Sequence, residues 1–339
     1  MASMDIFKDD AFSMVELSAA VREIEYVPQL LGELGIFEEK GVYTRKIGIE
    51  KKGDSLSLIE TSPDGAAPRQ SIQNLANIRD FRTVRLADSF TLYASEVAEM
   101  RAFGTESELR VVQVEYAERM ADVRTNMDLT HEFHRLGGLQ GKLLDADGTS
   151  VIYDYFDEFD IAEPAAIDFG LDVATTDIRG QCHDITRGMA RSAKGAFTTA
   201  TSVHALVGDG FFDDFVNHPN VVRTYEGWAA AADLRQNLAF QSFPFGGITW
   251  HNYRGTDDNS TVAIGSDEAK FFPVGAKDVF KKFVSPANEF MPFVGTKGQD
   301  VYAMNIEDKD RQAWVKGELY SYPLYMCVKP QVLRKAVGR

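Results

Sequence analysis

Cysteine is scarce in this 339-residue sequence, which contains only Cys182 and Cys327 and no CxxC pair. A disulfide framework is therefore not expected, and both residues are interpreted as small buried apolar side chains of a protein that folds in a reducing cytoplasm. No apolar run reaches 18 residues, so no membrane span is predicted. The acidic N-terminal stretch lacks the basic start and apolar centre of a secretion signal.

Positive charge is also scarce, because 36 Lys and Arg stand against 51 Asp and Glu, for a net charge of -15. This balance argues against a sequence-specific DNA-binding protein, which would present a basic face. The charge is unevenly distributed. Asp145 to Asp172 contains nine acidic residues and no Lys or Arg, whereas Lys40 to Phe90 carries a net positive charge. These two blocks either meet across copies of the chain or are both simply solvated.

Motifs for metal binding are incomplete. The segment 145–149 resembles the start of a calcium loop, but Ser150 and Phe156 occupy positions that require Gly and Glu. His131 and His134 are three residues apart, whereas a zinc-binding helix places its histidines four apart. We interpret these two histidines as a polar helix end and predict no metal and no cofactor.

Signals for catalysis are equally weak. Cys182, His183 and Asp184 are consecutive, and adjacent residues do not face one another on a helix. Gly208-Asp209-Gly210 lacks the Gly-Lys-Ser/Thr ending of a phosphate loop. We therefore predict that the protein is not an enzyme. A soluble α/β hydrolase that uses Cys182 or a histidine is retained only as an alternative.

The strongest secondary-structure signal is a helix within residues 93–136. Apolar side chains recur there at steps of three and four residues, at Leu109, Val112, Tyr116, Met120, Val123 and Met127. Thr105 and Glu108 form a candidate capping box, and Gly137-Gly138 is the expected stop. Thirty residues would be roughly 45 Å long, so the helix is expected to span a flat domain.

The other segments have weaker patterns. Residues 41–92 read as a hairpin-like excursion with a Pro/Gly-rich tip and few apolar residues, so we expect them to project. Residues 1–40 carry apolar side chains without a core of their own and need another surface. Residues 139–161 predict a hairpin, 180–240 predict mainly helices, including one over 203–216, and residues 240–255 and 260–339 predict strands.

The closing segment from Ser285 to Arg339 carries the clearest likeness to a known family. It contains SPANEFMPF, then GQDVYA, then KGELYSYPLYMCVKP. Together with NIRDFRTVRLAD at residues 77–88 and FPFGGI at 243–248, it resembles the lambda-like E family of tailed-phage major capsid proteins. The resemblance lies in the order of these phrases over nearly the whole chain.

This resemblance implies an α+β protein with the Hong Kong 97-type capsid fold. Its expected parts are an N-terminal arm, an E-loop, a P-domain built on a long spine helix, an A-domain, and terminal strands that return to the P-domain. In this sequence they would occupy 1–40, 41–92, 93–175, 176–294 and 295–339, respectively.

The implied function is that of a head subunit that assembles as hexamers and pentamers into an icosahedral shell around double-stranded DNA. The expected partners are further copies of the chain, a portal, a scaffold and possibly a decoration protein, with the DNA enclosed without sequence-specific binding. The expected location is the virion, after synthesis in the host bacterial cytoplasm. A cellular nanocompartment shell of the same fold is the main alternative. The candidate assembly residues are Phe12, Leu30, Leu31, Phe37, Arg45, Lys46, Lys51, Lys52, Arg69, Asp154, Asp157 and Glu158.

Overall fold

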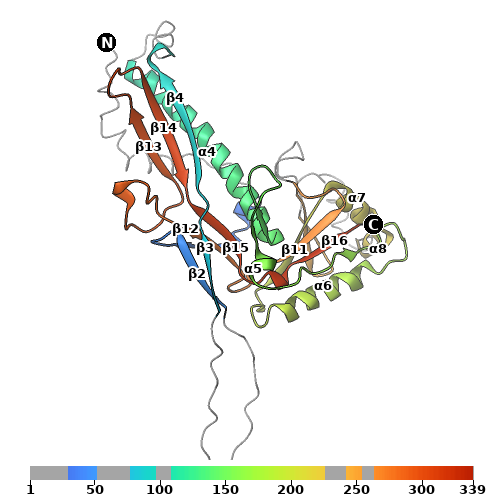
Figure 1. Ribbon diagram of the computed structural model, residues 1–339. Helices are drawn as coiled ribbons and strands as arrows, with labels where there is room; N and C mark the ends of the chain where they lie inside the picture. The colour runs from blue at the N-terminus through green and yellow to red at the C-terminus, as the bar shows by residue number, and fades with distance from the viewer. Residues whose placement is uncertain (1–29, 52–76, 97–107, 226–241, 254–262, 339) are drawn as a thin grey trace, which may run out of the picture.

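The computed structural model describes residues 30–51, 77–96, 108–225, 242–253 and 263–338. They form two unequal parts and a projecting hairpin (Figure 1). The elongated part holds the long helix α4 (Glu108–Gln140) and a three-stranded sheet. The sheet part holds a six-stranded sheet and the helices α6 (Ile178–Ser192), α7 (Asp209–Asn217) and α8 (Pro219–Tyr225).

The elongated part is organised by packing between α4 and its sheet. Strand β14 (Trp314–Ser321) lies between β4 (Leu86–Tyr93) and β13 (Tyr302–Glu307), and both pairings are antiparallel. Four side chains of the predicted apolar stripe on α4 are buried against this sheet, where Tyr116, Met120, Val123 and Met127 cluster with Leu92, Val315 and Leu319. The 33 residues of α4 give a length of roughly 50 Å. The prediction of a long helix is confirmed.

The predicted stop at Gly137-Gly138 is wrong, because α4 continues to Gln140. A Cβ on Gly138 would lie 3.0 Å from the Phe37 ring, and one on Gly137 would lie 2.8 Å from the carbonyl oxygen of Lys142. Because these two glycines have no Cβ, Phe37 and the backbone of Lys142 can pack closely against the end of α4. The chain turns out of the helix at Gly141, whose φ of +83° is in the left-handed region that favours glycine.

A short hairpin follows α4, as the sequence predicts. Strand β5 (Lys142–Leu144) pairs antiparallel with β6 (Val151–Asp154). The one-turn helix α5 (Tyr155–Glu158) comes next, and the Asp154 carboxylate accepts hydrogen bonds from the backbone N–H groups of Phe156 and Asp157. This N-cap fixes the start of α5 within the acidic block.

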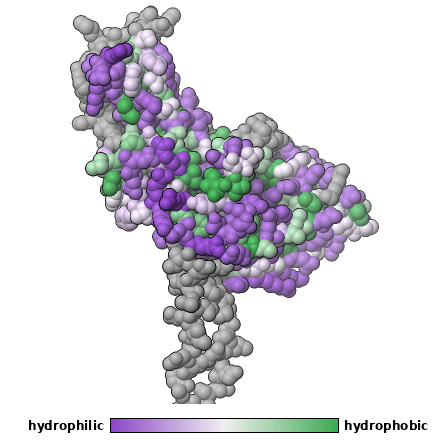
Figure 2. Space-filling view, in the orientation of Figure 1, coloured by the Kyte–Doolittle hydropathy of each residue, from purple (hydrophilic) through white to green (hydrophobic). Residues whose placement is uncertain are grey.

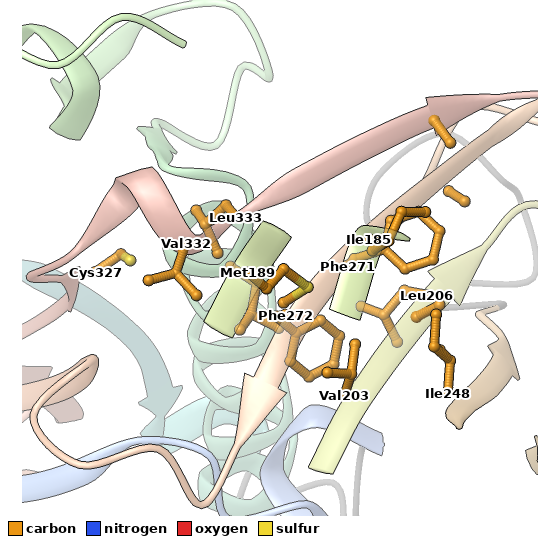
Figure 3. Close-up of a cluster of buried hydrophobic side chains, with 14 of the residues drawn as sticks. Ile185, Met189, Val203, Leu206, Ile248, Phe271, Phe272, Cys327, Val332 and Leu333 are labelled. Carbon is orange, nitrogen blue, oxygen red and sulfur yellow. The ribbon is translucent and has the colours of Figure 1, made fainter. Parts of the chain in front are cut away.

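The sheet part is a mixed sheet. Its strands, in spatial order, are β7 (Ile167–Asp168), β16 (Arg334–Val337), β11 (Glu268–Val274), β8 (Ser202–Val207), β10 (Ile248–Asn252) and β9 (Ser242–Phe245). Figure 3 shows its core, in which Ile185 and Met189 from α6 lie against Phe271 and Phe272 from β11. Val332, the last residue of the short helix η5 (Pro330–Val332), and Leu333, which follows it, close one end of this cluster.

The prediction of a helix over 203–216 is wrong in its first half. Residues 202–207 form the central strand β8, and the helix α7 begins only at Asp209. Val203 and residues 205–207 are buried in this strand, which lies between β10 and β11. A continuous apolar run of this length is compatible with either a buried strand or a helix, so periodicity could not separate the two.

A third sheet joins the two parts. In it β12 (Phe280–Val284) pairs parallel with β1 (Glu38–Gly41) and antiparallel with β15 (Pro323–Cys327). Three consecutive strands near the end of the sequence thus enter three different sheets, because β14 lies in the elongated part, β15 here and β16 in the sheet part. Residues that are distant in the sequence are therefore tied together at the centre of the subunit.

Candidate assembly surfaces

The hairpin of β2 (Lys46–Lys51) and β3 (Asn77–Arg82) extends away from the body of the molecule (Figure 1). Its base is anchored by Ile47 and Phe81, which oppose each other in the antiparallel register and are both buried. The Phe81 ring lies 5.7 Å from that of Phe159. These contacts fix the direction in which the hairpin leaves the subunit.

The basic residues predicted for assembly fall in different places along this hairpin. Lys46 forms an ion pair with Asp80 on the opposite strand at 2.6 Å. Lys51 is the last described residue of β2 and lies at the outer end of the hairpin. Lys52 and Arg69 lie outside the described residues.

The carboxylate of Glu289, in a loop distant in the sequence, contacts the residues that flank both strands at the base of the hairpin. Arg85 Nε donates hydrogen bonds to the two carboxylate oxygens of Glu289 at 2.8 and 3.1 Å, and Arg45 Nη1 lies 3.6 Å from the same carboxylate. The two guanidinium groups also stack over aromatic rings, Arg85 over Tyr320 at 5.1 Å and Arg45 over Tyr322 at 5.0 Å. The hydrogen bond to Glu289 raises the pKa of Arg85. We call these five residues the Glu289 clasp.

The acidic block from Asp145 onward meets basic residues within the same subunit. Arg79 on β3 forms ion pairs with Glu158 at 3.7 Å and with Asp160. Asp154 lies 3.3 Å from Lys142, in addition to its role as a helix cap. Asp157 is exposed, with its carboxylate at the surface of α5. Part of the predicted charge complementarity is therefore used inside the chain.

The described end of the arm packs on its own subunit. Leu31 in α2 (Leu30–Glu33) is 1% exposed, and the ring of Phe37 packs 5.4 Å from Phe280 and 5.2 Å from Tyr325. Leu30 packs, partly buried, against the same core. The expectation that this segment lacks a home in its own subunit is corrected here, because β1 joins the central sheet and brings these side chains with it. Phe12 lies outside the described residues.

A buried carboxylate on α4 ties the arm to both parts of the molecule. Glu132 accepts hydrogen bonds from the backbone N–H of Leu31 at 2.9 Å, from Arg135 Nη1 at 3.1 Å and from the Tyr253 hydroxyl at 3.4 Å. Burial raises the pKa of Glu132, and these hydrogen bonds oppose that shift.

The histidines on α4 are not a polar helix end, because His131 and His134 are both buried. The two ring nitrogens of His131 lie 2.7 Å from the Tyr325 hydroxyl and 3.1 Å from Ser321 Oγ. Burial lowers the pKa of His131 to about 3, so the ring is neutral at neutral pH. Helix α4 continues past them into the centre of the subunit, where β14 and β15 cover this face, and no local pattern in the sequence predicts that cover.

A buried ion pair lies beside this histidine. Lys282 on β12 is 2.6 Å from Asp300 and 2.9 Å from Glu39, and it lies 5.8 Å above the Tyr325 ring. Burial lowers the pKa of Lys282, but the interactions with Tyr325, Asp300 and Glu39 outweigh that effect and the net shift is upward. Because Glu39 lies on β1, this ion pair also fastens the arm to the central sheet.

The environment of Cys182 does not suit a nucleophile. Its thiol is buried, and burial raises its pKa to about 12, whereas His183 and Asp184 beside it are exposed. Among the described residues, no three His, Cys, Asp or Glu side chains converge as a metal site would require. Within the same ranges, no helix is both long and apolar enough to cross a membrane.

Comparison with known proteins identifies the family. The profile described as phage major capsid protein E matches residues 13–337. The chain belongs to this phage major capsid protein family. It is 25% identical to the major capsid protein of Salmonella phage Felix O1, with 95% of each chain covered.

Solved structures show the same fold. The capsid protein of Myoviridae phage XM1 matches with a TM-score of 0.51 and 12% identity, over 94% of this chain and 98% of that one. The mature capsid protein of bacteriophage PhiM1 matches with a TM-score of 0.52 and 10% identity, over 93% and 88%. The α+β prediction and the Hong Kong 97-type fold are confirmed.

The Glu289 clasp is the main feature of this capsid protein that sequence reasoning missed. Arg85 and Glu289 are 204 positions apart, and no periodic pattern connects them. Arg45 was assigned to contacts with a neighbouring copy, whereas its guanidinium already contacts Glu289 and Tyr322. Two arginines that flank a projecting hairpin were the available signal.

Proposed function

We propose that this chain is the major head subunit of a tailed bacteriophage or prophage and assembles as hexamers and pentamers into an icosahedral shell around double-stranded DNA. The observation that carries this proposal is the family match over residues 13–337, in a chain whose fold is that of phage capsid proteins. The proposed role is structural. In this proposal the protein is synthesised in the host bacterial cytoplasm and becomes part of the virion.

The projecting hairpin supports the proposal that copies of the chain assemble by contacting one another. Its base is fixed by Phe81, by the Glu289 clasp and by the ion pairs of Arg79, so β2 and β3 leave the subunit in a defined direction. The connecting residues 52–76 begin and end at the outer end of this hairpin. In the proposed shell the outer end of the β2–β3 hairpin contacts a neighbouring copy.

Charge at the outer end of the hairpin would orient that contact. Lys51 and Lys52 are adjacent in the sequence, and Asp157 is an exposed carboxylate of the acidic block. Lys46, Asp154 and Glu158 have ion pairs within the subunit, so they would contribute less to the attraction between copies. We propose Lys51, Lys52 and Asp157 as the first charged positions to test.

The net charge of -15 fits a wall that encloses DNA without binding it specifically. The proposed partners besides further copies are a portal, a scaffold and, in some heads, a decoration protein. The test is electron microscopy of particles from producing cells, followed by nuclease treatment and analysis of their contents. Shells with nuclease-protected DNA support the proposal. Shells that hold an enzyme instead would indicate a nanocompartment, and a discrete small oligomer under all conditions would overturn the proposal.

A further inference from the structure

The loop between β12 and β13 presents apolar side chains to solvent. Met291 is 87% exposed and Val294 is 55% exposed. They lie in and directly after the short helix η4 (Met291–Phe293). Figure 2 shows hydrophobic atoms at the left edge of the molecule, where Figure 1 places this loop. We call residues 286–299 the apolar loop.

The apolar loop is held firmly by its own subunit. The ring of Phe290 packs 5.0 Å from Tyr320, and that of Phe293 packs 4.6 Å from Tyr302. The backbone N–H of Gly298 donates to the carbonyl of Val42 at 2.9 Å. Phe290 and Phe293 thus serve as inner anchors, while Met291 and Val294 are exposed. Binding through these two side chains costs little conformational entropy of the backbone, because contacts within the subunit already hold the loop in place.

The Glu289 clasp connects this loop to the projecting hairpin. Glu289 belongs to the apolar loop, whereas Arg45 and Arg85 flank β2 and β3. The position of the loop is therefore set by the same contacts that set the base of the hairpin. If the apolar loop binds a neighbouring copy, the loop and the hairpin would therefore move together.

The charge of the chain indicates which partner fits this loop. Each copy carries a net charge of -15, so two copies repel one another through most of their surfaces. The charged residues of the apolar loop are Glu289, which is neutralised by two arginines, and Lys297. A neutral and apolar surface suits a contact between two copies of an acidic chain, because it adds no repulsion between like charges.

We propose that the apolar loop is a contact between copies, in which Met291 and Val294 of one subunit are buried against a second copy of this chain. This inference rests on the proposed assembly into a shell. It adds a surface that is separate from the outer end of the hairpin.

Thiol labelling tests the proposal directly, because both native cysteines are buried. A Met291→Cys variant places a reactive thiol on the loop, and a Val151→Cys variant places one at a matched position that is 56% exposed on β6. Both thiols are expected to react with a maleimide at similar rates in dissociated subunits. In assembled particles the thiol at position 291 is expected to react at least about tenfold more slowly, while that at position 151 keeps its rate.

The possible outcomes separate this inference from the proposed function. If shells form and the thiol at position 291 reacts as fast in them as in free subunits, the inference alone is overturned. It is also overturned if both thiols slow equally, because the protection is then not specific to the loop. If the wild-type chain forms no multimer, the inference fails together with the proposed function.

A second set of variants measures the contribution of the apolar side chains to assembly. Met291→Ser combined with Val294→Ser is expected to reduce the yield of particles about tenfold without changing the urea midpoint of the free subunit. Val151→Ser is the control and is expected to assemble normally, and Met291→Leu is expected to retain assembly. Full particle yield from the double serine variant would contradict the proposal.

Discussion

His131 makes stability depend on pH in a way that one substitution can isolate. The unfolded chain accepts a proton on this ring below the ordinary pKa of 6.5, whereas burial lowers the pKa in the folded subunit to about 3. The stability contributed by the neutral ring is complete above pH 6.5 and is lost as the pH falls toward 3. The full shift corresponds to about 4–5 kcal/mol, with a slope of roughly 1.4 kcal/mol per pH unit.

The substitution to make is His131→Gln. At pH 7 the variant should be less stable by about 1–3 kcal/mol, because the hydrogen bonds with Tyr325 and Ser321 are weakened or lost. Between pH 6 and pH 4, the free energy of unfolding of the variant should fall less steeply than that of the wild type. The two slopes should differ by about 1 kcal/mol per pH unit. His134 and His251, whose pKa values burial lowers to about 4, and His204, whose pKa burial also lowers, contribute to the remaining slope.

The assay is urea denaturation of the unassembled chain at pH 7, 6, 5 and 4, with the slope compared rather than the absolute stability. His183→Gln is the control, because it removes a histidine that is exposed on α6 rather than buried. If wild type and His131→Gln show the same slope, the argument from burial is refuted.

Three further predictions concern the clasp, the end of α4 and the hairpin. Glu289→Gln should lower the free energy of unfolding by only about 0.5–1 kcal/mol in urea denaturation, because the clasp side chains are partly solvated; a loss of several kcal/mol would contradict this. Gly141→Ala should cost about 2–3 kcal/mol in the same assay, since its φ is +83° and its new Cβ would collide with Phe156; unchanged stability would show that the turn relaxes freely. Lys51→Glu combined with Lys52→Glu should reduce the number of particles seen by electron microscopy more than it lowers the thermal midpoint. Normal particle numbers would remove the proposed role of these charges.

The sequence predicts best where a local period is repeated many times. Met120, Val123 and Met127 mark the buried face of α4, and the turn after Leu144 marks the β5–β6 hairpin. It predicts poorly where the tertiary fold decides, because residues 205–207 of β8 are all buried and give no diagnostic period. The resemblance to a family of capsid proteins supplied the architecture that local patterns could not.

The candidate surfaces divide in the same way. Composition identified the basic and acidic blocks, and the structure brings Arg79 and Glu158 together within one chain. Whether a charge serves its own subunit or a neighbour depends on distances in space, which composition does not contain. Glu289 was missed for the same reason, since its arginine partners are contributed by the opposite end of the sequence.

The placement of β14, β15 and β16 in three different sheets has a consequence for biosynthesis. When the ribosome has reached residue 313, none of these three sheets is complete, because each still lacks one of the strands β14, β15 and β16. Pairings over such long sequence separations also form slowly. Folding of these sheets is thus completed only after residue 337 has been synthesised, so unpaired strand edges stay exposed in the nascent chain until then.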